Sequence, residues 1–493
     1  MDANESINKP QTPSGAGWRL FNVLSKINTQ TIALAILFIL SLQPLFGIFD
    51  RTLFQYELVA LYYGKTVLIR FLGYLGAANW FIDFYRRAYI YKKEAWKQTL
   101  LKRPWTGLLG VLLVWSFIAV FFAADKHLAF FGGPYRYEGF VSYAAYAGIF
   151  LNAALIRGEK QRKTLLVSVA AVSTALAVFA VLKEFSGTAL LMYRNGLVGP
   201  FSATFINANH YGYYLCVSLM VIAGLYMTCK TLWAKITCAA CFTLNLTVLL
   251  YNSTLGAYLA LALGMVFYTV FCLIRKGFKK TWYIFILIAI FVILSFTVNG
   301  HQVINDFKLL TQQTGDVIDI IGSGGTETPE GQQAINSIGS ARGKLWKNTV
   351  KVILANPVTG VGTDNIQLYI SNEIPHNEYL QIAANLGFPG IIFYLAALVS
   401  CFAYAVKNLK KLSDCTLIAG MATLVYCVSA FVGISITVST FQLFLFLGLL
   451  TGWFKQRDET ALNEKIMARL GKKPEATPAG TGEPPKESEP VQN

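Results

Sequence analysis

The stretch WYIFILIAIFVILSFTV, residues 282–298, contains no charged side chain. About 20 apolar residues are needed for a helix to cross a bilayer. Similar runs recur along the chain and predict twelve spans, at 31–49, 58–81, 105–122, 140–155, 164–182, 211–227, 232–250, 255–273, 282–298, 388–406, 415–432 and 438–454. The second span carries Lys65 and Arg70, which we expect to face the helix bundle or to reach the interface, because a charge in lipid is costly.

The amino-acid composition agrees with a protein that crosses the membrane many times. Of the 493 residues, 55% are hydrophobic and 14% are charged, whereas soluble proteins carry about 25% charged residues. We therefore predict an all-α polytopic membrane protein. The net charge of +16 lies mainly in short loops on one side, which is a topology signal of membrane proteins and gives no reason to expect a nucleic-acid partner. The eight cysteines show neither metal-ligand nor disulfide spacing.

The spans and the charges divide the chain into five parts. Lysines and arginines gather in the loops on the N-terminal side of the membrane, which predicts a multi-pass protein of the plasma membrane with both termini in the cytoplasm. The parts are a cytoplasmic N-terminal segment (1–30), transmembrane helices 1–9 (31–298), an extracytoplasmic catalytic loop (299–387), helices 10–12 (388–454) and a largely disordered cytoplasmic tail (455–493).

The long loop before the tenth span carries three polar motifs. They are Gly339-Ser-Ala-Arg342-Gly-Lys-Leu-Trp346, Asn356-Pro-Val-Thr-Gly-Val-Gly362 and Pro375-His376-Asn377-Glu-Tyr-Leu380. Residues 322–331 have the composition of a flexible linker. Ser340 is a suitable cap for a helix that ends at Leu354. A second helix is expected to begin near Pro375 and to stop at Gly387. Both amphipathic helices would lie on or dip into the outer face of the membrane.

Two residues of these motifs could carry chemistry. His376 in a first helical turn would be kept neutral by the helix dipole and could accept a proton from a hydroxyl. It could equally cap its own helix or bind a nearby carbonyl. Arg342 in a first turn is poorly placed for a cation, which suggests a bound anion such as phosphate, or else a pair with Asp364 or Glu373. The Gly360-Val-Gly362 turn could form an anion nest or simply reverse the chain.

Two further polar loops lie upstream on the outer side. Residues 131–139 contain Arg136, which could bind substrate or pair with Glu138. Residues 183–210 contain Arg194 and end in Asn209 and His210, which could bind a sugar or phosphate, or cap the next helix. The sequence shows no paired carboxylates beside a plausible cleft and no acidic cluster, which argues mildly against metal-dependent transfer.

At this point the motifs resemble those of a known family. The Arg-x-x-x-Trp, Pro-x-x-Gly-x-Gly and His-Asn-x-x-Leu-Gln segments have the order and spacing found in O-antigen ligases, and Gly387-Phe-Pro-Gly390 follows as it does there. Residues 131–139 and 207–210 also resemble family members. The resemblance covers spans three to twelve. Its superfamily includes ligases that join glycan to lipid A core, Wzy-type O-antigen polymerases and protein O-oligosaccharyltransferases, and its ligases have a GT-C-like fold.

The resemblance implies an inverting glycosyltransferase without metal or cofactor. The donor would be a glycan on a polyprenyl diphosphate such as undecaprenyl diphosphate, presented at the outer leaflet. The acceptor hydroxyl could belong to a glycan, lipid, protein or wall polymer. By resemblance, His376 would be the general base and Arg342 would hold the diphosphate. Arg136, Arg194, Asn209, His210 and Asn377 would bind substrate.

One departure from the family pattern keeps further functions open. Ligases of the family usually carry a second arginine in a Ser/Thr-Arg-Gly/Ala pattern, where this chain has Ser253-Thr-Leu255-Gly-Ala257. Stabilisation of the leaving group would then fall to Arg136 or Arg194, or the chain is a divergent, non-catalytic member. The chain could also be a polysaccharide polymerase or a transporter of lipid-linked saccharide, although it has no internal repeat of the kind that many transporters show.

Overall fold

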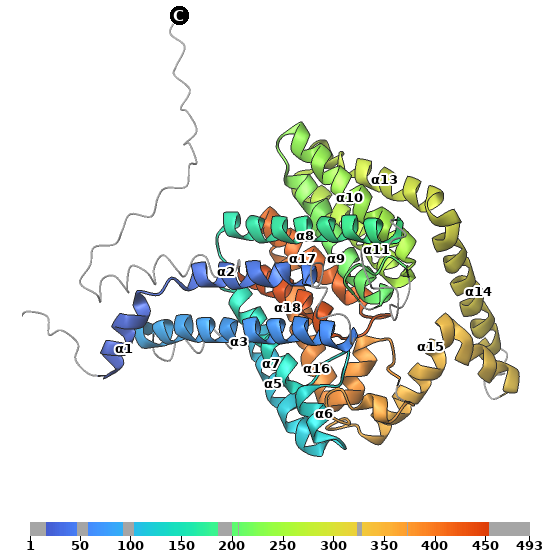
Figure 1. Cartoon of the computed structure of the whole chain (residues 1–493), viewed down its shortest axis with the longest axis horizontal. Coiled ribbons are helices and arrows are strands. Elements are labelled where there is room, and N and C mark those ends of the chain that lie inside the picture. Colours follow the sequence, from blue (N-terminus) through green and yellow to red (C-terminus); the bar gives the residue numbers. More distant parts are fainter. Residues whose placement is uncertain are drawn as a thin grey trace, which may run out of the picture.

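The computed structural model describes residues 16–46, 58–91, 103–185, 200–205, 207–322, 328–371 and 373–452. This part of the chain is helical and contains no β-strand (Figure 1). Its α-helices are α1 (Ala16–Ser25), α2 (Thr29–Leu42), α3 (Leu58–Tyr91), α5 (Pro104–Phe122), α6 (Lys126–Phe131), α7 (Phe140–Ala153), α8 (Glu159–Phe185), α9 (Ala208–Thr228), α10 (Leu232–Asn252), α11 (Leu255–Lys276), α12 (Phe278–Thr281), α13 (Ile284–Thr297), α14 (Gln302–Gly322), α15 (Pro329–Ala355), α16 (Glu378–Lys407), α17 (Asp414–Ser429) and α18 (Thr437–Gly452).

Each predicted span overlaps one of these helices. By length and composition, seven helices of the described chain can cross a membrane, and the pair α1 and α2, bent by 57°, adds an eighth if it is one span. The helices α7, α13, α17 and α18 are apolar but shorter. The all-α polytopic membrane class is therefore confirmed, while the count of twelve spans stays a prediction. The predicted tail, residues 455–493, lies outside the described residues.

The centre of the bundle is formed by α9 and α18, whose residues are almost all buried. α9 packs against α8, α10, α11 and α17, and α18 packs against α7 and α17. The charged residues of the second predicted span face the protein, as expected. Lys65 is fully buried and donates to the carbonyl oxygen of Thr204 over 2.9 Å, and Arg70 donates to the hydroxyl of Ser142 over 2.9 Å.

A break in α16 sets the approach to the site. Gly387 has φ 68° and ψ −173° inside this helix, and a Cβ atom there would lie 2.1 Å from the carbonyl oxygen of Val358. Only glycine fits both this backbone conformation and this contact. The predicted helix stop at Gly387 is thus confirmed, and the short first part of α16 is set apart from the apolar part that follows.

The loop before α16 differs from the prediction. α14 and α15 pack together as a long helical pair that reaches away from the bundle (Figure 1). The sequence pattern did not reveal α14. α15 begins at Pro329, so Ser340 caps no helix and Arg342 lies in the helix interior, because the polar residues before Ser340 include no helix breaker beyond tolerable glycines. Of the predicted linker, residues 329–331 are helical and residues 323–327 lie outside the described chain.

Candidate active site

His376 directly precedes the cap of α16. The helix begins at Glu378, and the side chain of Asn377 accepts a hydrogen bond from the backbone N–H of Leu380 over 3.0 Å. The prediction that His376 lies in the first turn is therefore wrong, because asparagine is the better N-cap and fixes the start of the helix two residues later. Asn377, predicted to bind substrate, uses its side-chain oxygen for this cap.

The backbone and the charge of His376 are both unusual. Its φ of 48° lies in the left-handed region. The pKa of its imidazole is lowered to about 4, first by burial and then by the positive charges of Arg342 and Arg136. The imidazole is thus neutral at pH 7 and can accept a proton. The two arginines, from segments far apart in the sequence, both lie near the same imidazole.

A cavity of about 600 Å³ lies next to α15. Arg342 and Trp346 face it from α15, and the indole nitrogen of Trp346 donates to the carbonyl oxygen of Pro375 over 2.7 Å. His376 itself does not line the cavity, but it follows Pro375 directly. Other lining residues are Asn209, Tyr213, Ser253, Thr254, Leu255, Gly256, Leu259, Ala260, Asp306, Leu309, Leu310, Gln313, Val428, Phe431 and Val432.

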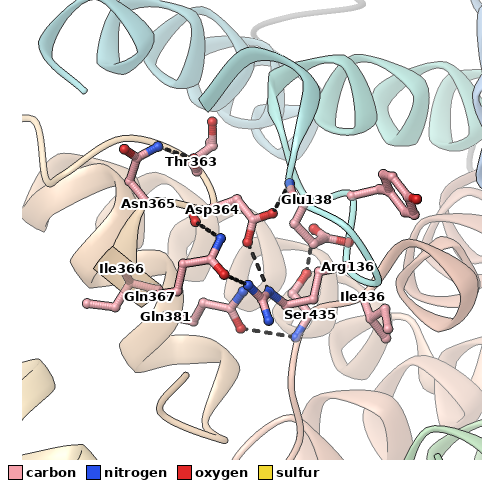
Figure 2. A network of polar contacts seen from close by, with 12 residues as sticks. Arg136, Glu138, Thr363, Asp364, Asn365, Ile366, Gln367, Gln381, Ser435 and Ile436 are labelled. Atoms are coloured by element: carbon pink, nitrogen blue, oxygen red, sulfur yellow. Dashed lines mark hydrogen bonds and ion pairs between the residues drawn. The ribbon is translucent and has the colours of Figure 1, made fainter. Parts of the chain in front are cut away.

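Arg136 sits in a network of polar contacts shown in Figure 2. Its Nε lies 3.1 Å from a carboxylate oxygen of Asp364, and its guanidinium also donates to Gln367. The second carboxylate oxygen of Asp364 accepts from the backbone N–H of Gly133 over 2.6 Å. Asp364 is fully buried, and burial raises its pKa although Arg136 opposes the shift. Arg136 therefore joins two loops and is committed to Asp364.

This network corrects two of the expected ion pairs. Arg136 does not pair with Glu138, whose carboxylate instead accepts from the hydroxyls of Tyr146 over 2.5 Å and of Ser435 over 2.7 Å. Asp364, one expected partner of Arg342, is taken by Arg136 instead. The reason lies in the fold, since Asp364 and Gly133 meet only when the loops before α7 and α16 pack together.

The carboxyl groups of Glu138 and Glu378 are buried near the site, which could not be expected from the sequence. Burial raises the pKa of Glu138 to about 8, and the charges of Asp364 and Glu378 add to this shift. Glu378 accepts from the hydroxyls of Tyr394 and Tyr426, each over 2.8 Å. Each of these two residues lies at the end of a polar loop, where side chains are usually exposed. No motif around them indicates burial.

The remaining predicted residues have separate positions. The ring nitrogen Nδ1 of His210 lies 3.0 Å from the hydroxyl of Tyr62. Asn209 lines the cavity, and its side-chain oxygen accepts from Thr254 over 3.3 Å. The cap of α9 is formed by Asn207, not by Asn209 or His210. Arg194 lies outside the described residues.

In the glycine turn after α15, two backbone amides are already hydrogen-bonded and so are not free to bind an anion. The backbone N–H groups of Val361 and Gly362 donate to the carbonyl oxygens of Ala384 and Asn385, each over 2.9 Å. These amides are satisfied by α16, so the interpretation as a simple turn is correct. Gly360 and Gly362 both have positive φ, at 64° and 91°.

Comparison with known protein families gives a match to part of the chain. Residues 239–395, which run from α10 to the kinked part of α16, match the family O-Antigen ligase. This match places residues 239–395 in the O-antigen ligase superfamily. No curated protein matches the sequence. The matched range contains Leu255, Arg342 and His376, while Arg136 and Asn209 lie upstream of it.

The part of the chain that matches the ligase family includes Leu255, where ligases usually carry a second arginine. α11 begins at Leu255, and the preceding Ser253 has a left-handed φ of 59°. Leu255 lines the same cavity as Arg342. The position at which the sequence departs from the ligase pattern thus lies on the wall of the cavity that also contains Arg342.

Several residues in the loops of this protein have a strained, left-handed backbone conformation. Tyr135, Tyr137, Asp364, Ser371 and His376 all have φ between 48° and 71°. Such residues cost of order 1–3 kcal/mol each and gather at functional sites. Among the described residues, no group of three or more His, Cys, Asp or Glu side chains is arranged to hold a metal ion.

Proposed function

We propose that this chain is a membrane glycosyltransferase that moves a glycan from a polyprenyl diphosphate carrier to an acceptor hydroxyl. His376 is the general base, and Arg342 holds the diphosphate. One observation carries the proposal: a neutral histidine lies near an arginine that faces a cavity of about 600 Å³. The membership in a superfamily of membrane glycosyltransferases supports it.

The lining of the cavity fits an amphipathic donor. The side chains of Arg342, Asn209 and Gln313 supply donors for phosphate oxygens, and a guanidinium can bind two such oxygens at once. Leu259 and Leu310 belong to the apolar part of the wall, which suits a polyprenyl chain because burial of apolar surface is favourable. A donor with a charged and an apolar half matches both kinds of wall.

The reaction requires one proton transfer and one substitution. His376 takes the proton of the acceptor hydroxyl, and the oxygen attacks the anomeric carbon of the donor sugar. The bond from that carbon to the diphosphate oxygen breaks, its electron pair stays on the diphosphate, and the configuration inverts. Arg342 stabilises the charge that develops on the leaving group, which is the kind of electrostatic effect that lowers such barriers most. The imidazolium then releases its proton to water.

The membrane orientation belongs to the same proposal. The excess of lysine and arginine on one side supports a plasma-membrane protein with cytoplasmic termini. The active face would then be extracytoplasmic, where a flipped lipid-linked donor is presented.

Reconstitution into liposomes tests the proposal. Purified protein receives a labelled polyprenyl diphosphate-linked glycan together with an envelope acceptor extract. Transfer of label with release of polyprenyl diphosphate is expected from wild type and from His127→Ala, a variant of an exposed histidine on α6. Transfer should be lost in His376→Ala. Full transfer by His376→Ala in correctly inserted protein would refute the proposed base.

The same assay separates the competing functions. Label that stays on the lipid carrier in products longer than one repeat identifies a polymerase. Movement of intact donor across the bilayer without any glycosidic product identifies a transporter. No product from any donor, with donor still bound, identifies a non-catalytic member.

A further inference from the structure

The loop of residues 132–139 is held by contacts from several directions. Arg70, which projects from α3, donates to the carbonyl oxygens of Phe131 over 2.6 Å and of Tyr137 over 2.9 Å. The backbone N–H of Thr437 donates to the carbonyl oxygen of Arg136 over 3.2 Å, and the hydroxyl of Thr437 reaches the same oxygen over 2.9 Å. The pair of Arg136 with Asp364 adds a further contact.

These contacts enforce an unfavourable backbone. Tyr135 has φ 71° and Tyr137 has φ 55°, and bulky side chains rarely adopt positive φ. Such a backbone conformation persists only where several contacts from the surrounding structure hold it in place. A membrane arginine, a threonine and a buried ion pair all serve to keep this one loop in place. The loop is therefore preorganised, which is a common property of binding surfaces.

The loop presents aromatic rings to the outside. Tyr135 is 46% exposed, and Tyr63 at the start of α3 is 55% exposed. Tyr137 is buried beneath them, with its ring centroid 5.8 Å from that of Tyr63. The pKa of Tyr137 is raised first by burial, with smaller contributions from Tyr63 and Tyr135, so both exposed tyrosines lie close to it.

We propose that Tyr135 and Tyr63 form the acceptor subsite of the transferase and that the acceptor is a saccharide. A pyranose ring has apolar C–H faces that pack on the negative face of an aromatic ring, while a tyrosine hydroxyl at the rim can bond to sugar hydroxyls. This inference rests on the proposed function, because it assigns the second substrate of the same site.

The position of the loop supports an acceptor more than a donor. Arg136, which directly follows Tyr135 in sequence, lies near His376, which must reach the acceptor hydroxyl. None of residues 131–139 lines the cavity that contains Arg342. The base thus lies near two separate surfaces, one suited to a lipid diphosphate and the other to sugar rings.

A binding measurement tests the subsite independently of catalysis. Full-length His376→Ala protein in nanodiscs is mixed with methyl glycosides of glucose, galactose and N-acetylglucosamine, and saturation-transfer NMR reports the sugar protons in contact. We expect signals from the ring C–H protons that fall about fivefold in Tyr135→Ala, since an aromatic contact contributes roughly 1 kcal/mol beyond its area. Tyr135→Trp should keep them.

The matched control is Phe307→Ala on α14. Phe307 has the same exposed fraction, 46%, and lines neither surface. Sugar binding should be unchanged in this variant. Equal losses in Phe307→Ala and Tyr135→Ala, or no sugar contact in any protein, would overturn the subsite. Unchanged sugar binding in Tyr135→Ala would also overturn it, and would assign Tyr135 to the membrane interface, where tyrosines are common.

Kinetics of the active protein give the second test. In Tyr135→Ala, the half-saturating acceptor concentration should rise about fivefold, by the same aromatic contact energy, while that of the lipid donor stays constant. A parallel rise for the donor would contradict the assignment. Absence of transfer by wild type would refute the proposed function, and the binding measurement would still decide whether the tyrosines bind sugar.

Discussion

Trp346 donates a hydrogen bond from its indole nitrogen to the carbonyl oxygen of Pro375 over 2.7 Å. This bond ties α15, which carries Arg342, to the residue that directly precedes His376. The candidate base and the candidate anion-binding group, which lie on separate segments of the chain, are thereby fixed relative to each other.

Replacement of Trp346 by phenylalanine should separate the effect on the placement of the reacting groups from the effect on the stability of the protein. Trp346→Phe keeps most of the packing but loses the hydrogen bond, which should cost about 1 kcal/mol of unfolding free energy. A small displacement of the reacting groups lowers the reaction rate much more than it lowers stability. We therefore expect the transfer rate to fall at least about tenfold. Transfer rates and melting temperatures of the purified variants measure the two effects.

Trp115 provides a matched control. Its indole nitrogen donates to the carbonyl oxygen of Leu386 over 2.9 Å, at the other end of the same short part of α16. Trp115→Phe should lose similar stability and keep most of its activity. Equal activity losses in the two variants would show that this helix segment as a whole, not the Pro375 contact, is what matters.

The pH dependence of transfer should reveal the low pKa of His376. Because burial and two arginines lower this pKa to about 4, the imidazole stays neutral as pH falls from 7 to about 5. The rate should be constant in this range and then fall about tenfold per pH unit below 4, as the base becomes protonated. Loss of half the activity near pH 6.5, the ordinary value for histidine, would contradict this assignment.

Removal of a neighbouring charge should move this profile in a known direction. Arg342→Gln takes away a cation that disfavours imidazolium, so the pKa of His376 should rise and the acid limb should shift to higher pH. The residual rate of this variant as a function of pH measures the shift. An unmoved acid limb would mean that Arg342 does not act on His376.

An arginine at position 255 should strengthen donor binding. Leu255 lines the cavity that Arg342 faces, and a charge-assisted hydrogen bond contributes about 1.5–3 kcal/mol. We expect Leu255→Arg to lower the half-saturating donor concentration about tenfold and to recover part of the transfer lost in Arg342→Gln. Leu255→Met is the control for packing. No gain over Leu255→Met would show that position 255 does not contact the donor.

Glu138 should make the protein less stable as pH rises. Its folded pKa of about 8 exceeds the ordinary value of 4.5, so its contribution is complete below pH 4.5 and is lost as pH rises through 8. Between these values the unfolding free energy should fall by up to about 1.4 kcal/mol per pH unit. Melting temperatures between pH 5 and 8 measure this slope.

The isosteric variant tests the source of this slope. Glu138→Gln cannot ionise and can still accept from Tyr146, so its melting temperature should depend less on pH than that of wild type. Glu373→Gln, at an exposed glutamate, should leave the wild-type slope in place. A slope that persists in Glu138→Gln would assign it to another buried group.

Local features of the chain could be predicted well. Apolar runs placed a helix at each expected span, because partition into lipid depends on the composition of a short segment. The stop at Gly387 was equally predictable, since its backbone requirement is local. The start of α15 was missed because weak local signals, such as Ser340, do not outweigh a longer stretch of helix-compatible residues.

The partners of the polar residues could not be predicted. Arg136 and Asp364 are 228 residues apart, and the sequence suggested only the nearby Glu138 as a partner of Arg136. The hydroxyl of Ser435 reaches Glu138 across 297 residues. No periodicity or spacing encodes such a pair, because it depends on how separate loops meet above the packed helices.

By itself, the sequence determined that this is a helical membrane protein, where its apolar helices lie and which motifs carry candidate chemistry, since each of these depends on residues close together in the chain. Only the tertiary structure decided that Arg342 and Arg136 lie near His376, that Leu255 shares a cavity with Arg342, and that burial keeps His376 neutral. Burial and the distance between charges set these properties, and both exist only once distant segments have packed together.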